Sequence, residues 1–156
     1  MKAKSKEENT VTLRITCGNL HKATYPNVKD LTSVQEKTKF TWIAFVDCGL
    51  TRNQSEMLIQ KVVFGFNSSY ENPIRTVSKH PFKVFEKGSE PFEVSIIIHW
   101  RARLKMKALT LKHTLSFVNH ENCSVHLLKI KRAYLSDPEI KQTTEKVINK
   151  SRFKLR

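Results

Sequence analysis

The chain has 156 residues, of which 28 are Lys or Arg and 14 are Asp or Glu, giving a formal net charge of +14. This length suits one domain with a single hydrophobic core. No apolar run approaches the roughly 18 residues of a membrane-spanning helix, and the charged N-terminus lacks the apolar segment of a signal peptide. We therefore expect a cytosolic or nuclear protein, and the charge favours a polyanionic partner such as nucleic acid, the nucleosome surface or an anionic membrane face.

The first strands follow from alternating and dense apolar residues. Residues 1–9 are polar, and we expect them to be disordered. The folded domain is predicted over residues 10–135, beginning with a half-buried strand at Thr10–Cys17. The polar stretch Gly18–Lys39 predicts a long loop. Thr41–Cys48 is rich in aromatic and β-branched residues and predicts a strand that is buried on both faces.

The second half of the domain continues the same pattern. Gly49–Glu56 predicts a polar turn, and the next strand runs from Met57 or Leu58 to Phe66. Asn67–Pro81 contains turn-forming prolines, so we expect it to link strands rather than to join a central one. Four more strands are predicted: Phe82–Glu86, Phe92–Arg101, Ala108–Val118 and Ser124–Leu135. Seven or eight short strands favour an all-β, immunoglobulin-like β-sandwich.

Residues 136–156 predict a short helix and a basic tail. The sequence Ser-Asp-Pro at 136–138 offers an N-cap followed by proline at the start of a helix over Asp137–Asn149. Three apolar residues share one face of this helix: Ile140, Val147 and Ile148. The last residues read KSRFKLR, which is a basic segment.

Basic residues alternate in the connection that follows Trp100. They are Arg101, Arg103, Lys105 and Lys107. If this connection is extended, the four side chains point to one side and form a stripe. Such a stripe neutralises phosphates without reading bases, so the DNA backbone is a predicted partner. The alternative is a solvated hairpin whose charges have no ligand.

No enzyme or metal site is predicted. His120, Cys123 and His126 are spaced by three, but residues three apart in an extended segment fall on opposite faces. Cys48 has no base-orienting acid at a recognisable spacing, which favours a buried structural cysteine. The four glycines form no phosphate-binding motif. We therefore expect no cofactor, and three cysteines at unrelated spacings predict no disulfide framework.

The segment from Val62 to Trp100 carries a recognisable order of motifs. It reads VVFGFNSSYENPIRTVSKHPFKVFEKGSEPFEVSIIIHW and joins a strand, a Ser-Ser-Tyr loop, an Asn-Pro-x-Arg turn, a Pro-Phe corner, a Gly loop and a second strand. This order resembles the YEATS domain, a family of chromatin readers. Three further segments are similar to that family: ITCGNLHKAT, FTWIAFVD and ALTLKHTLSF, the last with His113 in a Leu-x-His element. The resemblance covers about Val11 to Leu135 and is strongest to members of remodelling and acetyltransferase complexes.

The resemblance implies an acyl-lysine pocket at the loop end of the sandwich. Ser69 stands where the family offers a hydroxyl, and Tyr70 follows as an aromatic wall. Ser89 occupies the position where the family places Trp or Tyr, so the second wall of the clamp is missing. The implied pocket comprises Phe40, Asn67, Ser69, Tyr70, Ser89, Glu90 and Phe92. Asn67 and Phe40 stand where the family carries histidines, and Phe40 is a candidate substitute wall.

The resemblance also implies partners and location. We expect a nuclear, chromatin-associated module that binds histone tails, with acetyl- or crotonyl-lysine as candidate ligands, inside a larger protein complex. The pocket could also accept a different side chain. The alternative is a scaffold subunit of a transcription or remodelling complex whose pocket no longer reads lysine.

Overall fold

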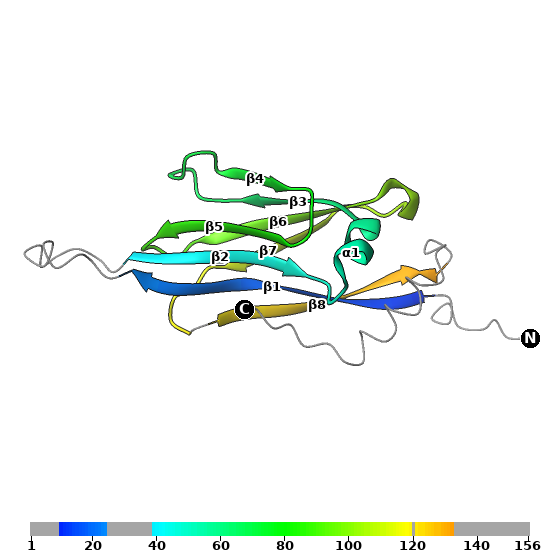
Figure 1. Cartoon of the computed structure of the whole chain (residues 1–156), viewed down its shortest axis with the longest axis horizontal. Helices are drawn as coiled ribbons and strands as arrows, with labels where there is room; N and C mark the ends of the chain where they lie inside the picture. Colours follow the sequence, from blue (N-terminus) through cyan, green and yellow to red (C-terminus); the bar gives the residue numbers. More distant parts are fainter. Residues whose placement is uncertain (1–9, 25–38, 120, 133–156) are drawn as a thin grey trace, which may run out of the picture.

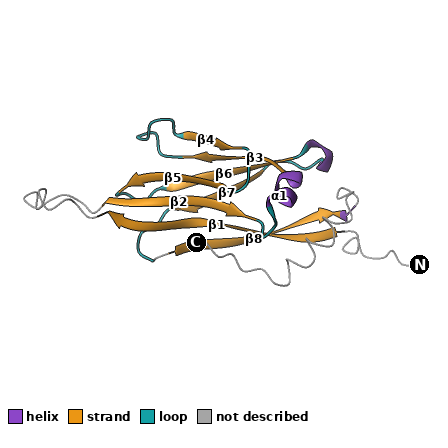
Figure 2. Ribbon diagram, in the orientation of Figure 1, coloured by secondary structure: helices purple, strands orange, loops and turns teal. Residues whose placement is uncertain are grey.

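The computed structural model describes residues 10–24, 39–119 and 121–132, which form two antiparallel β-sheets packed face to face (Figures 1 and 2). Sheet A has the strand order β5-β2-β1-β8, and sheet B has the order β4-β3-β6-β7. The strands are β1 Thr10–Thr24, β2 Lys39–Asp47, β3 Ile59–Gly65, β4 Ile74–Val77, β5 Phe82–Gly88, β6 Glu93–Trp100, β7 Leu109–Thr114 and β8 Glu121–Lys131. This arrangement confirms the predicted all-β, immunoglobulin-like sandwich.

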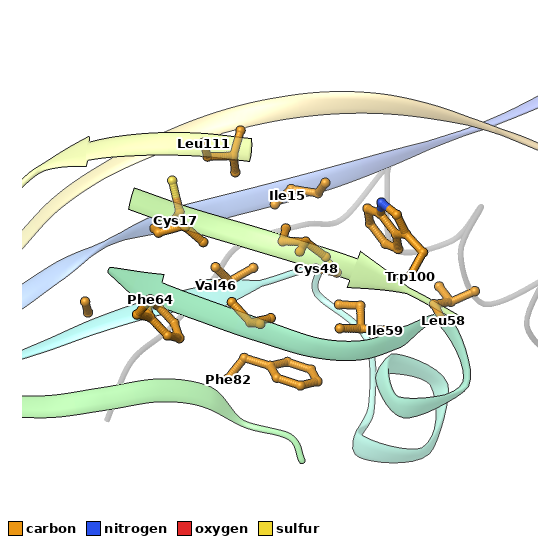
Figure 3. Close-up of a cluster of buried hydrophobic side chains, with 14 of the residues drawn as sticks. Ile15, Cys17, Val46, Cys48, Leu58, Ile59, Phe64, Phe82, Trp100 and Leu111 are labelled. Atoms are coloured by element: carbon orange, nitrogen blue, oxygen red, sulfur yellow. The ribbon is translucent and has the colours of Figure 1, made fainter. Parts of the chain in front are cut away.

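The core lies between the two sheets. Alternate residues of each strand point inward, which is the period expected of strands with one buried face. Figure 3 shows side chains from both sheets meeting there: Ile15, Cys17, Val46, Phe64, Phe82 and Trp100. The predicted two-sided burial of the second strand is confirmed at Phe45, which alternates with core residues Ala44 and Val46 yet is only 2% exposed.

Strand β1 is longer than predicted. It runs to Thr24, so the expected loop at Gly18–Lys39 is wrong for its first seven residues. Residues 16–24 pair with β2, and residues 10–20 pair with β8. The polar residue Asn19 is fully buried in this extension and satisfies its side chain by hydrogen bonds. A buried but paired polar residue of this kind is not visible in hydropathy.

The predicted polar turn at Gly49–Glu56 is also wrong, because helix α1 spans Arg52–Leu58. Thr51 Oγ1 accepts from Gln54 N at 3.2 Å, and Gln54 Oε1 accepts from Thr51 N at 2.9 Å. This reciprocal pair is a capping box, for which the Thr-x-x-Gln spacing was the available signal. In the described part of the chain, neither α1 nor the 3-10 turn η3 at Ala102–Leu104 is long and apolar enough to cross a membrane.

Two other expectations concern strands and chain ends. The segment Asn67–Pro81 contains strand β4, which pairs with β3 and, among the described strands, lies at the edge of sheet B, as expected of a segment outside the sheet centre. The predicted disordered N-terminus, 1–9, and the predicted helix and basic tail, 136–156, lie outside the described residues. His120 of the considered metal triplet also lies outside them.

Candidate functional site

Two loops, residues 66–73 and 88–92, lie at one end of the sandwich, on the left of Figure 1. We call them the tip loops. The first is shaped by Asn67, whose Oδ1 accepts from Ser69 N at 3.2 Å while its carbonyl oxygen accepts from Tyr70 N at 3.1 Å. Phe66 N donates to Pro73 O at 2.7 Å and closes the loop. Asn67 therefore acts through the backbone as an Asx-turn residue.

Ser69 sits exposed at the crest of this turn. Its backbone N–H is used by Asn67, but its hydroxyl makes no hydrogen bond to any residue in the described ranges. The hydroxyl is therefore available to a ligand, either as a donor or as an acceptor.

Arg75 holds the first tip loop against strand β5. Its guanidinium donates to Asn72 O at 2.5 Å and to Glu71 O at 3.0 Å, and it lies 4.8 Å from the centre of the Phe66 ring. The same group forms an ion pair with Glu86 of β5, with 2.7 Å between Arg75 Nη2 and Glu86 Oε2. Burial acts to raise the pKa of Glu86, but the hydrogen bond from Arg75 holds this pKa below its usual range.

Tyr70 is packed into an aromatic cluster. Its ring centre lies 5.4 Å from that of Phe92, 5.6 Å from that of Phe66 and 6.2 Å from that of the fully buried Trp42. Edge and tilted contacts of this kind are favourable beyond their buried area. Burial raises the pKa of the Tyr70 phenol, while the Trp42 indole acts to lower it. The cluster fixes the position of the Tyr70 ring before any ligand arrives.

The two tip loops meet at Gly88. A Cβ atom at Gly88 would collide with the Tyr70 hydroxyl oxygen and would lie 3.6 Å from Tyr70 Cζ. Glycine at this position therefore permits the close approach of the Tyr70 ring. Ser89 follows directly and is half-buried, whereas Glu90 is exposed. The structure thus brings the predicted residues Tyr70 and Phe92 into contact and places Ser69, Ser89 and Glu90 on the two loops that meet there.

Phe40 lies at the same end but faces a second aromatic group. It pairs with Gly88 in the β2–β5 register, and its ring stacks on Phe117 with 4.3 Å between centres and 12° between planes. His21 contacts both rings edge-on at 5.3 Å and 5.4 Å. Phe117 and His21 were not predicted as site residues, and their contact with Phe40 has no local sequence signal.

A buried hydrogen-bond network supports the segment that carries Phe117. His113 Nε2 lies 2.7 Å from Asn19 Oδ1, and Asn19 Nδ2 donates to Ser116 O at 2.9 Å. Ser116 N donates back to Asn19 Oδ1 at 3.3 Å. Burial lowers the pKa of His113, so the neutral imidazole is favoured. The Leu-x-His element therefore links β7 to β1 beneath the tip.

The connection that follows Trp100, which carries the predicted basic stripe, is not extended. Residues Ala102–Leu104 form the 3-10 turn η3, and Lys105 has a left-handed backbone with φ 50°. Arg101 Nε donates to Glu56 O at 2.8 Å, and Arg103 Nη2 donates to Met57 O at 3.0 Å. The expectation of four side chains in one row is wrong, because two of them bind carbonyls at the end of α1. This connection lies at the end of the sandwich opposite the tip loops (Figure 1).

Comparison with known proteins gives a consistent result. The YEATS family model matches residues 37–119. Transcription initiation factor TFIID subunit 14b of Arabidopsis thaliana is 34% identical over 74 residues, which are 47% of this chain and 27% of that protein. The AF-9 homolog of Schizosaccharomyces pombe is 36% identical over 75 residues, which are 48% of this chain and 34% of that protein. The match thus spans about a third or less of these relatives.

Solved structures share the fold. The YEATS domain of Yaf9 superposes with a TM-score of 0.70 at 23% identity, covering 92% of this chain and 99% of that one. A Yaf9 YEATS domain recognising an H3K122suc peptide gives a TM-score of 0.67 at 22% identity and covers 94% of this chain and 98% of its own. Because the family model matches more than half of its residues, the chain belongs to the YEATS family.

Proposed function

We propose that the tip loops bind histone tails and that the ligand is the side chain of an acylated lysine. The observation that carries this proposal is the contact of Tyr70 with Gly88, which sets an aromatic ring, a free hydroxyl and the 88–92 loop at one end. Yaf9 YEATS domains of the same fold are described as bound to H3K27ac and as recognising H3K122suc. Acetyl- and crotonyl-lysine are the first candidates.

An acyl-lysine amide fits the two groups that this site offers, the Ser69 hydroxyl and the Tyr70 ring. The carbonyl oxygen needs a donor, since a buried acceptor without one costs about 1–3 kcal/mol. The exposed Ser69 hydroxyl can supply that hydrogen bond, and the planar amide can lie against the Tyr70 ring. Asn67 and Arg75 hold this loop in place through backbone contacts, so little ordering is needed on binding.

Ser89 sets the expected strength of binding. A serine has no ring to stack on the second face of the amide, which removes about 0.5–1.5 kcal/mol beyond the lost buried area. Readers of this kind at tens of micromolar would then weaken to roughly hundreds of micromolar or millimolar. The stacking of Phe40 on Phe117 means that Phe40 must break an existing contact to replace the missing wall.

A peptide titration followed by amide NMR shifts tests the proposal. Acetylated, crotonylated and unmodified lysine peptides are compared, and only the acylated peptides should shift Ser69, Tyr70 and Glu90. Ser69→Ala should abolish the shifts, whereas Ser68→Ala, at the exposed neighbour, is the matched control and should retain them. Equal shifts with the unmodified peptide would contradict acyl recognition.

A second candidate is a scaffold subunit that does not read lysine, and the missing aromatic at Ser89 favours it. No shift with any peptide at millimolar concentration would support this alternative. In either role we propose a nuclear protein that acts within a transcription or chromatin complex. A catalytic role has little support, because burial raises the pKa of both buried thiols, Cys17 and Cys48, and so disfavours the reactive thiolate.

DNA contact is a separate proposal, carried by the net charge of +14. Because Arg101 and Arg103 already bind carbonyls of α1, the exposed Lys105 and Lys107 are the stronger phosphate candidates. A mobility assay on nucleosomal DNA should show affinity that falls steeply with salt. Lys107→Glu should weaken DNA binding and reduce the dependence of affinity on salt concentration. An affinity that changes neither with salt nor with this substitution would contradict the proposal.

A further inference from the structure

Sheet A carries apolar side chains on its outer face, which is turned away from the core. On β8, Val125 and Leu127 are 44% and 69% exposed. They pair with Thr16 and Arg14 of β1, which alternate with core residues and therefore also face outward. The outer face of an antiparallel sandwich is normally polar, so an apolar strip there indicates a contact surface.

The apolar rows continue onto β2. Phe45, which is itself only 2% exposed, pairs with Gly18 of β1 and Lys83 of β5, in the row next to that of Val125, Thr16 and Asp47. The following row contains Leu20, Ile43 and Phe85, and Phe85 is 57% exposed. Apolar residues therefore occupy consecutive rows from β8 toward the opposite edge of sheet A.

We propose that residues 137–149 of the same chain pack on this face as an amphipathic helix, along β8 and β1, and cover the exposed side chains of Leu127 and Val125. This segment lies outside the described residues, and its helix is a prediction from sequence. Its apolar face would consist of Ile140, Val147 and Ile148. Packing one apolar helix stripe on a sheet face is a standard way to bury both.

The lengths agree with this placement. The chain leaves β8 at Lys131, and Leu127 and Cys123 lie about 13 Å and about 27 Å back along that strand. Residues 133–136 can reverse direction over about 13 Å. A helix over 137–149 is about 20 Å long. A chain that turns back after β8 would therefore lay this helix across the rows of Leu127, Val125 and Phe45.

Charge and tethering favour this segment over other occupants. Residues 137–149 contain three acidic and two basic side chains, whereas Arg14 and Lys83 flank the apolar strip on the outer face. A second copy of the chain would instead bring together two molecules of charge +14, which repel each other. A tether of a few residues also gives the segment a local concentration in the millimolar range.

Methyl NMR of the full chain tests the proposal. We expect cross-peaks between the methyl groups of Ile148 and those of Leu127 or Val125. Amide exchange in residues 140–148 should be slowed by about tenfold or more, because an isolated helix of this length is marginal in water. Absence of these cross-peaks together with unprotected amides would overturn the proposal.

Two variants separate docking from general effects. Ile148→Glu places a charge on the apolar face and should remove the cross-peaks and the exchange protection, while the residues of the core between the two sheets keep their chemical shifts. Gln142→Glu adds the same charge on the opposite face of the helix and should retain both. Docking is wrong if Gln142→Glu also loses the cross-peaks and the exchange protection. Docking within one chain is wrong if a mixed-labelled sample gives the cross-peaks only between molecules.

Discussion

The Arg75 guanidinium lies 2.7 Å from the Glu86 carboxylate and joins the first tip loop to strand β5. Both side chains are about one quarter exposed, so the pair is better shielded than a surface ion pair. The guanidinium also binds the carbonyl oxygens of Glu71 and Asn72. One side chain thus fixes the loop that presents Ser69 and Tyr70.

Removing this guanidinium should loosen the loop and weaken peptide binding. We expect Arg75→Ala to lower the free energy of unfolding by about 1–2 kcal/mol, because hydrogen bonds to charged groups are lost. Lys112→Ala is the matched control, since its pair with Glu93 spans 3.8 Å and both side chains are more than half exposed. Urea unfolding measures both variants, and equal losses would show that the Arg75 contacts add nothing to stability.

Acid should weaken the same contact. The folded-state pKa of Glu86 is lowered, so its ion pair stabilises the fold above the unfolded-state pKa and is lost as the pH falls through the folded value. Unfolding free energies measured from pH 6 to pH 3 should therefore fall less steeply in Glu86→Gln than in the unmodified chain. Parallel pH profiles would contradict the role of Glu86.

The contact between Tyr70 and Gly88 predicts a rescue experiment. Gly88→Ala should destabilise the chain by about 1 kcal/mol, because the added Cβ meets the Tyr70 hydroxyl and the ring is held by its aromatic neighbours. In the Tyr70→Phe background the hydroxyl is gone and the nearest ring carbon lies at an ordinary contact distance. The double-mutant cycle should then show a favourable coupling. Additive losses would mean that the loops are further apart.

Protonation of His113 should destabilise the tip. Burial lowers its folded-state pKa, so below pH about 6.5 the unfolded chain binds more protons and stability falls with pH toward the folded value. Between pH 7.5 and 5.5 the unmodified chain should lose more stability than His113→Gln. His99→Gln on β6 is the matched control for the loss of an imidazole. If the unfolding free energy of His113→Gln depends on pH as steeply as that of the unmodified chain, protonation of His113 is not the cause of the loss.

The sequence predicted the sandwich well because its strands alternate or run apolar, as Thr10–Cys17 and Phe92–Arg101 do. Prediction from the sequence failed where contacts with distant residues, rather than the local residue pattern, decide the backbone structure. Asn19 extends β1 because His113, far along the chain, satisfies its amide. Lys105 ends a tight 3-10 turn, which alternating charge does not reveal.

For the site, sequence reasoning found the loop residues but not what holds them. Ser69, Tyr70 and Ser89 were identified by resemblance, and the structure brings their loops together. Arg75 and Phe117 were missed as site residues because their roles depend on partners in other strands, which neighbouring residues do not encode. The Asn-Pro-x-Arg turn was the one local hint for Arg75.

Restoring the second aromatic wall tests how much binding the site has lost. Ser89 follows Gly88, the residue that contacts Tyr70, and is only half-buried, so a ring at this position would lie next to the Tyr70 loop. We expect Ser89→Trp to strengthen acyl-lysine peptide binding by roughly 2- to 10-fold, the equivalent of one aromatic contact.

The titration should include Ser89→Leu, which adds apolar area without a π face. If stacking is the missing contribution, Ser89→Trp should exceed Ser89→Leu with acylated peptides and match it with the unmodified peptide. Equal gains in both variants would assign the effect to apolar area. If neither variant binds acylated peptides more tightly, the scaffold role is the better description, because a second aromatic wall would then add no contact with an acyl-lysine ligand.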